Sequence, residues 1–140
     1  MDLIFCLDNK QGMMFNHRRQ SRDKEVIQDI LRLTDGHKIW MQPYSAAIFP
    51  EKCPQIQIAE FPWNHAMEDE YYYIENADPN TLLDKKVKEL IVYFWNRDYP
   101  GDLFCTIDFS TFLCADETEF AGFSHEKITR KIFEVKENYK

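Results

Sequence analysis

A group of arginine side chains lies between residues 16 and 22. It holds three arginines beside an asparagine and a histidine, namely Asn16, His17, Arg18, Arg19 and Arg22. Guanidinium groups that stand together near the start of a helix can bind a phosphate or a carboxylate. Arginines in a loop more commonly face water and pair with surface carboxylates, which stabilises a protein little. Asn16, Arg18, Arg19 and Arg22 are therefore candidate ligand-binding residues, with a solvated loop as the alternative.

Cysteines and histidines form no recognisable metal or nucleophile motif. The four cysteines stand at wide spacings, none of them at metal-ligand spacing from a histidine, and no H-x-H-x-D-H or H-E-x-x-H string occurs. We therefore expect no bound metal. Cys6 and Cys105 lie in apolar runs and are expected to be buried, reduced thiols. The string Ser124-His125-Glu126 has the groups of a catalytic triad, but adjacent side chains cannot converge as a triad does, so we interpret it as a cap.

Length and charge limit the class of protein. A chain of 140 residues has the usual size of one domain, so we predict a single domain over residues 1–140. The net charge of −7 disfavours nucleic acid as a partner. No apolar run is long enough to span a membrane, and the first residues lack the features of a signal peptide. We expect a cytoplasmic protein whose partner is a small molecule or another protein, with no membrane contact.

Apolar runs bounded by turn-forming residues predict strands at residues 3–7, 38–41, 55–58, 71–74, 90–95, 103–109 and 128–135. A helix is predicted from a Ser21 cap to Leu33, a helical turn from Ser45 to Phe49, and a short capping-box helix from Thr81 to Val87. The stretch that joins Phe109 to Ile128, which contains Gly122, is expected to be irregular. Strands that alternate with helices first, and stand alone later, predict an α/β fold. Its central sheet is mainly parallel, with an antiparallel C-terminal edge, and helices flank it.

Several strings, taken in order, resemble the dihydrofolate reductase family. The strand and turn at residues 3–12 are similar to the family's first strand and the start of its substrate loop. Thr34-Asp-Gly-His-Lys-Ile-Trp-Met41 resembles the family's Thr-x-Gly-x-Pro-Val-Ile-Met, and Tyr99-Pro-Gly-Asp-Leu-Phe104 resembles x-x-Gly-Asp-Thr-x-Phe-Pro. The resemblance covers the chain from end to end, with a deficit between Gln42 and Glu70. It implies a dihydrofolate reductase-like fold.

The departures from the family bear on function. A glycine pair that lets reductase backbone amides approach the NADPH diphosphate is replaced here by Glu75 and Asn76. The arginine that pairs with the 2′-phosphate corresponds to Pro43, and the threonine that helps to hold the pterin corresponds to Tyr93. The resemblance thus implies that NADPH and folate binding are both lost, and we expect no cofactor.

The resemblance also implies a role for Asp23, which lies where the reductases carry their pterin-binding carboxylate. It implies a half-buried group with a raised pKa that anchors a ligand. The alternative is that Asp23 only stabilises the start of a helix. Asp23 and Tyr93 join the basic group as candidate ligand-binding residues.

Our first functional hypothesis is a non-catalytic small-ligand or protein-binding domain of dihydrofolate reductase-like fold. The alternative is a divergent oxidoreductase that uses Asp23 as proton donor or substrate anchor. Small chains similar to this one sometimes carry a ribonuclease Z label. That nuclease activity requires histidine and aspartate strings that bind metal, and because these are absent we do not favour it.

Overall fold

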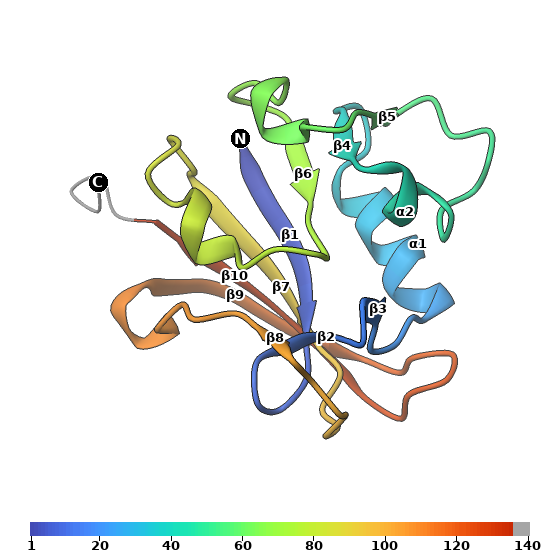
Figure 1. Cartoon of the computed structure of the whole chain (residues 1–140), viewed down its shortest axis with the longest axis vertical. Coiled ribbons are helices and arrows are strands. Elements are labelled where there is room, and N and C mark those ends of the chain that lie inside the picture. The colour runs from blue at the N-terminus through green and yellow to red at the C-terminus, as the bar shows by residue number, and fades with distance from the viewer. Residues whose placement is uncertain (136–140) are drawn as a thin grey trace.

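A computed structural model describes residues 1–135 and contains a mixed seven-stranded sheet in the order β5-β4-β6-β1-β7-β10-β9 (Figure 1). The strands are β1 (Asp2–Leu7), β4 (Ile39–Met41), β5 (Ile56–Ile58), β6 (Tyr71–Tyr73), β7 (Glu89–Phe94), β9 (Leu113–Phe120) and β10 (Ile128–Glu134). The first five run parallel, β10 is antiparallel to β7, and β9 is antiparallel to β10. The predicted α/β class is confirmed, as is the mainly parallel sheet with an antiparallel C-terminal edge.

A small three-stranded sheet lies beside the large one. It has the order β3-β2-β8 and is formed by β2 (Gly12–Phe15), β3 (Arg18–Arg19) and β8 (Leu103–Phe104). Asn16 and His17 make the turn between β2 and β3 with positive φ angles of 52° and 61°, as a two-residue hairpin turn requires. The basic group is therefore on a hairpin. The strand predicted over residues 103–109 is wrong beyond Phe104.

The helices are fewer and shorter than expected. They are α1 (Lys24–Leu33) and α2 (Pro43–Ala46), with 3-10 turns η1 (Pro62–Asn64), η2 (Pro79–Leu82) and η3 (Phe109–Thr111). Asp23, not Ser21, caps α1, because its side chain accepts a hydrogen bond from Glu25 N. The helix predicted from Thr81 to Val87 is wrong, since the Asp78 side chain caps a single turn that starts at Pro79 instead.

The longest strand, β9, was predicted to be irregular, and that prediction is wrong. Seven of its eight residues are exposed, so its sequence lacks the apolar alternation by which a strand is recognised. Pairing with β10 holds it in the sheet, with a register shift at Ile132/Phe133.

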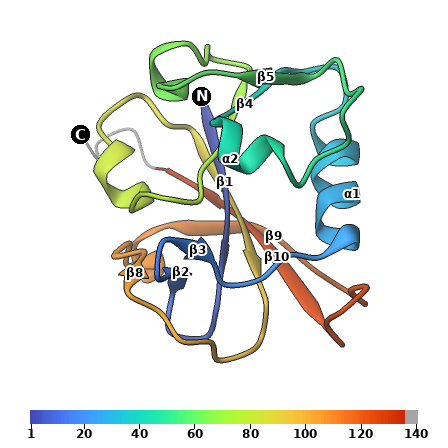
Figure 2. The ribbon, with the colours of Figure 1, turned by 45° about the vertical axis from the view of Figure 1, so that its right-hand side comes forward.

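Two hydrophobic clusters cover the two faces of the large sheet. Alternation along β1 sends Leu3, Phe5 and Leu7 into one cluster and Ile4 into the other. The helix α1 lies beside the sheet and packs on the Ile4 side through Val26 and other apolar residues (Figure 2). The strands of the large sheet are held by packing against these clusters, and they therefore position the loops at their ends.

Candidate functional site

The carboxyl ends of four parallel strands meet at one edge of the large sheet. Asp8 follows β1, Trp95 follows β7, Glu75 lies shortly after β6, and α2 begins after β4. The strands β4, β5 and β6 lie on one side of β1 and β7 lies on the other, so the strand order reverses beside β1. Ligands of open α/β sheets bind outside the carboxyl ends of the strands at such a point.

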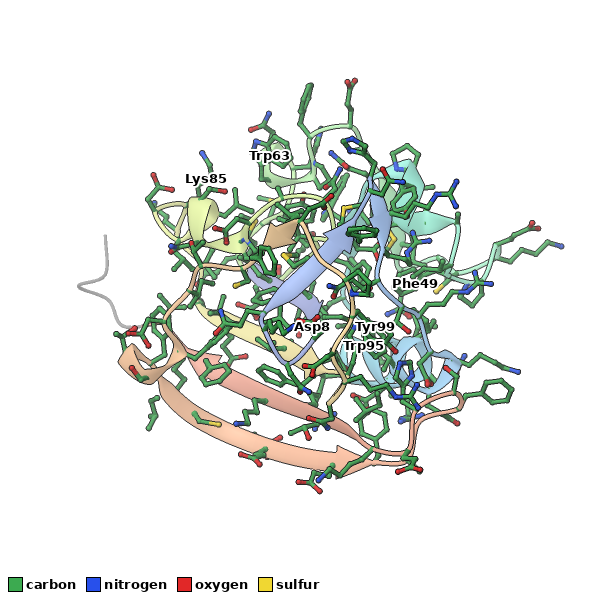
Figure 3. All side chains as sticks on the ribbon, turned by 60° about the horizontal axis from the view of Figure 1, so that its bottom comes forward. Asp8, Phe49, Trp63, Lys85, Trp95 and Tyr99 are labelled. Atoms are coloured by element: carbon green, nitrogen blue, oxygen red, sulfur yellow. The ribbon has the colours of Figure 1, made fainter. Side chains whose placement is uncertain are left out.

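Asp8 organises the loops at this edge, where it contacts the backbone of Tyr99 (Figure 3). Its buried Oδ1 accepts hydrogen bonds from Gly12 N at 2.7 Å and Lys10 N at 2.9 Å. Its Oδ2 accepts one from Tyr99 N at 3.1 Å and one from the Gln20 side chain at 3.2 Å. One carboxylate thus ties together the loop after β1, the end of β3 and the loop after β7.

Asp23 is fully enclosed, with no exposed side-chain surface. Its Oδ1 accepts from Glu25 N and Phe123 N, and its Oδ2 from Ser124 N and His125 Nδ1, all at 2.8 Å. Burial acts to raise the pKa of Asp23, but the hydrogen bonds from Phe123, His125 and Ser124 outweigh it and hold the pKa well below its ordinary value. The raised pKa that the resemblance implied is therefore wrong.

His125 connects Asp23 to two hydroxyl groups. Because a carboxylate only accepts, Nδ1 of the neutral ring carries the proton that faces Asp23, and Nε2 is left as an acceptor. Nε2 lies 2.9 Å from the Tyr99 hydroxyl and 3.0 Å from Ser21 Oγ. The ring also stacks on Trp95, with centroids 4.6 Å apart. The imidazole is therefore fixed on both edges and on one face.

A second polar group, formed by Arg19 and Glu75, lies at the same edge. The Arg19 guanidinium donates two hydrogen bonds to the Glu75 carboxylate, at 2.9 and 3.0 Å, and lies 4.1 Å from the centroid of the Tyr44 ring. Ser45 Oγ donates to the same carboxylate at 2.8 Å. Glu75 stands where the resemblance places a phosphate-binding glycine. It pairs with Arg19 and neutralises the positive charge that a bound anion would need.

A small inner cavity lies between these two polar groups. Its volume of about 10 Å³ suits a single water-sized group. It is lined by Cys6, Met13, Arg19, Gln20, Ser21, Tyr73, Ile74, Glu75 and Trp95. Burial raises the pKa of the Cys6 thiol to about 12, so this group is not a thiolate at neutral pH. Within residues 1–135, the buried Gln20 Oε1 has no hydrogen-bond partner.

A wider crevice, called the outer crevice, also lies at this edge of the sheet. Its volume of about 570 Å³ is in the range of small-molecule sites. The lining residues are Met14, His17, Tyr44, Asn76, Asp102 and Leu103. They include one carboxylate but, in the part of the chain that is described, neither lysine nor arginine. Residues next to each other in the sequence line the two spaces: Met13 and Glu75 line the inner cavity, and Met14 and Asn76 line the outer crevice.

The candidate residues of the basic group end up in different places. Arg19 points to the inner cavity, whereas Arg18 is exposed on the hairpin. Asn16 N donates to the Asp102 carboxylate of the outer crevice at 3.0 Å. Arg22 and Asp23 border a separate surface hollow of about 340 Å³. The structure therefore does not bring the arginines together into one anion site.

Tyr93 is buried in the core, away from both spaces. Its hydroxyl donates to Asp29 Oδ2 at 2.7 Å, and the same oxygen accepts from Arg130 Nη1 at 2.8 Å. Burial raises the pKa of Tyr93 well above its ordinary value. The side chain links α1, β7 and β10, and its predicted contact with a ligand, like that of Asp23, stays a prediction.

Sequence reasoning missed the meeting of Ser21, Tyr99 and His125. Ser21 was interpreted as the helix cap and His125 as part of a local cap, and neither was connected to Tyr99. These residues lie far apart in the sequence, so no local spacing reveals them. The sequence does show polar residues next to the ends of apolar strands. That pattern does not reveal which of these residues contact one another.

Within residues 1–135, no three His, Cys, Asp or Glu side chains are arranged to hold a metal ion. No helix in that part of the chain has the length and apolar character needed to cross a membrane.

No protein-family model matches the sequence, and no curated protein is detectably similar to it.

Proposed function

We propose that this chain binds a small, neutral or cationic organic molecule in the outer crevice, on a fold of dihydrofolate reductase type. The observation that carries the proposal is a crevice of about 570 Å³ at the carboxyl edge of the parallel strands, where α/β proteins bind ligands. The mainly parallel sheet with antiparallel C-terminal strands supports the fold assignment, and so does an aspartate at the start of α1.

The charge of the crevice supports the class of ligand. Asp102 is its one carboxylate, and His17 and Asn76 can donate or accept hydrogen bonds beside the apolar Met14 and Leu103. A phosphorylated dinucleotide would meet the carboxylate without a facing lysine or arginine, because Arg19 is already paired with a carboxylate. A neutral or cationic ring fits this lining better.

The alternative of an oxidoreductase with Asp23 as proton donor gains no support from the site. A proton donor must hold its proton near neutral pH, whereas hydrogen bonds hold the pKa of Asp23 well below its ordinary value despite its burial. The carboxylate is ionised and turned toward His125.

The test is amide NMR and calorimetry with a panel of neutral and cationic aromatic fragments, including nicotinamide and benzamidine, and with NADPH for comparison. We expect saturable shifts at Met14, Asn76 and Leu103. Leu103→Trp should fill the crevice and weaken binding by about tenfold or more. Leu113→Trp, on the exposed strand β9, is the matched control and should leave binding unchanged. Shifts confined to another surface, or saturable binding of NADPH alone, would contradict the proposal.

A further inference from the structure

Ser21, His125 and Asp23 form a continuous chain of hydrogen bonds that the proposed ligand site does not use. Ser21 Oγ lies 3.0 Å from His125 Nε2, and His125 Nδ1 lies 2.8 Å from Asp23 Oδ2. We propose that Ser21 is an activated nucleophile for acyl transfer, with His125 as its general base and Asp23 as the carboxylate that orients the base. This inference does not rest on the proposed function.

Two hydroxyl groups lie within reach of His125 Nε2, that of Tyr99 at 2.9 Å and that of Ser21 at 3.0 Å. The Tyr99 hydroxyl also reaches Ser21 Oγ at 3.3 Å, and in the arrangement in which it donates there, the Ser21 proton faces the unprotonated Nε2. The Asp23 carboxylate fixes the tautomer by accepting from Nδ1. A hydroxyl within reach of a base that is itself oriented by a third group is the arrangement that activates serine.

Burial separates this relay from an ordinary surface contact. The side chains of His125 and Asp23 are 2% and 0% exposed, so the ring cannot turn away into water. Ser21 is half-buried and borders the inner cavity, where a reacting group can meet it. Asp23 therefore holds the His125 ring in one orientation, while the Ser21 hydroxyl stays accessible from the cavity.

The other nucleophilic side chain at the cavity is Cys6, which lacks such a base. Its sulfur lies 3.7 Å from the Tyr73 hydroxyl, and desolvation keeps it in the thiol form. Ser21 is therefore the residue at which covalent chemistry is expected.

The reaction is written for an ester. Ser21 Oγ bonds to the carbonyl carbon while its proton moves to His125 Nε2. The carbon–oxygen bond to the alcohol then breaks, and the leaving oxygen takes that proton. Water next attacks the carbonyl carbon of acyl-Ser21 while His125 Nε2 takes a proton from the water. The bond from that carbon to Ser21 Oγ then breaks, Oγ takes the proton from His125, and the carboxylic acid leaves. The net change is ester plus water to acid plus alcohol.

The cavity limits the acyl group to a short chain. Its volume of about 10 Å³ is room for one water-sized group, so any acyl group has to displace lining side chains, and a longer chain has to displace more of them. Gln20 also lines the cavity, and its Oε1, which has no partner in residues 1–135, is an acceptor for a hydroxyl or N–H of the substrate. We therefore expect acetate esters to be preferred over hexanoate esters.

The first experiment treats the whole chain with an ethoxy fluorophosphonate and locates the adduct by peptide mass spectrometry. In this reaction Ser21 Oγ bonds to phosphorus, fluoride leaves, and His125 takes the serine proton. We expect labelling at Ser21 and none at Ser110, whose hydroxyl contacts the Asp108 carboxylate but no imidazole. Labelling only at Tyr99 or at Ser124, or no labelling while a serine esterase in the same tube reacts, would overturn the proposal.

The second experiment measures p-nitrophenyl acetate and p-nitrophenyl hexanoate hydrolysis. Ser21→Ala and His125→Gln should each lower the acetate rate by about a hundredfold or more, while Ser110→Ala should leave it unchanged. Should His125→Gln fail to fold, Tyr99→Phe is the alternative variant, because it removes the hydroxyl beside Nε2 and keeps the His125 ring in place. Hydrolysis that persists in Ser21→Ala, or that prefers hexanoate, would overturn the assignment of Ser21 or of the substrate class.

Discussion

The Asp23 carboxylate has two roles that are usually given to separate groups. It caps α1 through Glu25 N, and it holds the 121–126 loop through Phe123 N, Ser124 N and His125 Nδ1. A buried charge is tolerated only when its hydrogen-bonding capacity is satisfied. Because the donors come from two distant segments, the residue is a cross-link as well as a cap.

Asp23→Asn should destabilise the fold by roughly 2–4 kcal/mol, because the amide keeps one acceptor but places a donor against donors. Asp35→Asn, in the exposed turn after α1, is the matched control and should change the free energy of unfolding by no more than about 0.5 kcal/mol. Urea unfolding at neutral pH measures both. A loss below about 1 kcal/mol for Asp23→Asn would mean that Asp23 acts only through the helix dipole.

The stabilities of wild type and of Asp23→Asn should respond differently to acid. The pKa of Asp23 is lowered in the folded state, so its stabilising effect is complete above the unfolded value of about 3.9 and is lost as the pH falls below it. The difference between wild type and Asp23→Asn should therefore shrink below about pH 4. A difference that grows on acidification would mean that the folded pKa is raised.

Prediction of the elements succeeded where the side chains of an element are buried. The strands β1, β6 and β7 lie between two apolar clusters, and their apolar runs identify them. It failed for β9, since pairing with β10 rather than burial of side chains forms that strand. The start of α1 was misplaced because Ser21 and Asp23 are both good caps, and only the distant loop decides between them.

The candidate site was predictable only in part, for a related reason. Arg19 and Asp23 were recognised as residues able to do chemistry, but their partners Glu75 and His125 lie 56 and 102 residues away. Ion pairs and hydrogen bonds over such separations follow from the chain topology, which a local pattern does not contain. The pKa of Asp23 was therefore predicted in the wrong direction.

The 121–126 loop should tolerate no side chain at Gly122. A Cβ there would lie 2.7 Å from Asp23 Oδ2 and 2.8 Å from the His125 carbonyl oxygen. Gly122→Ala should therefore cost roughly 1–3 kcal/mol, since backbone must move. Gly101→Ala is the control, because its Cβ would meet side-chain atoms only, the nearest being the Gln20 amide nitrogen at 2.9 Å. Thermal unfolding of the two variants compares them, and an equal or smaller loss for Gly122→Ala would show that the loop adapts.

Across the whole molecule, the two hydrophobic clusters are built on opposite faces of the same strands. Leu90 and Val92 of β7 face one cluster while Ile91 and Tyr93 face the other, so neither face can lose its packing without disturbing β7. The site at the carboxyl edge depends on this coupling, because the loops after β1 and β7 are tied together by Asp8.

Tryptophans report on both faces, since Trp63 packs against the first cluster and Trp95 belongs to the second. Two variants separate the signals: one carries Trp40→Phe with Trp63→Phe, the other Trp40→Phe with Trp95→Phe. In each variant the fluorescence midpoint in urea should coincide with the midpoint from far-ultraviolet circular dichroism, as one cooperative transition requires. If the Trp63 signal changed before the circular dichroism did, its face would unfold separately. The shared strands would then not couple the two clusters, and Asp8 and Asp23 would join parts that open independently.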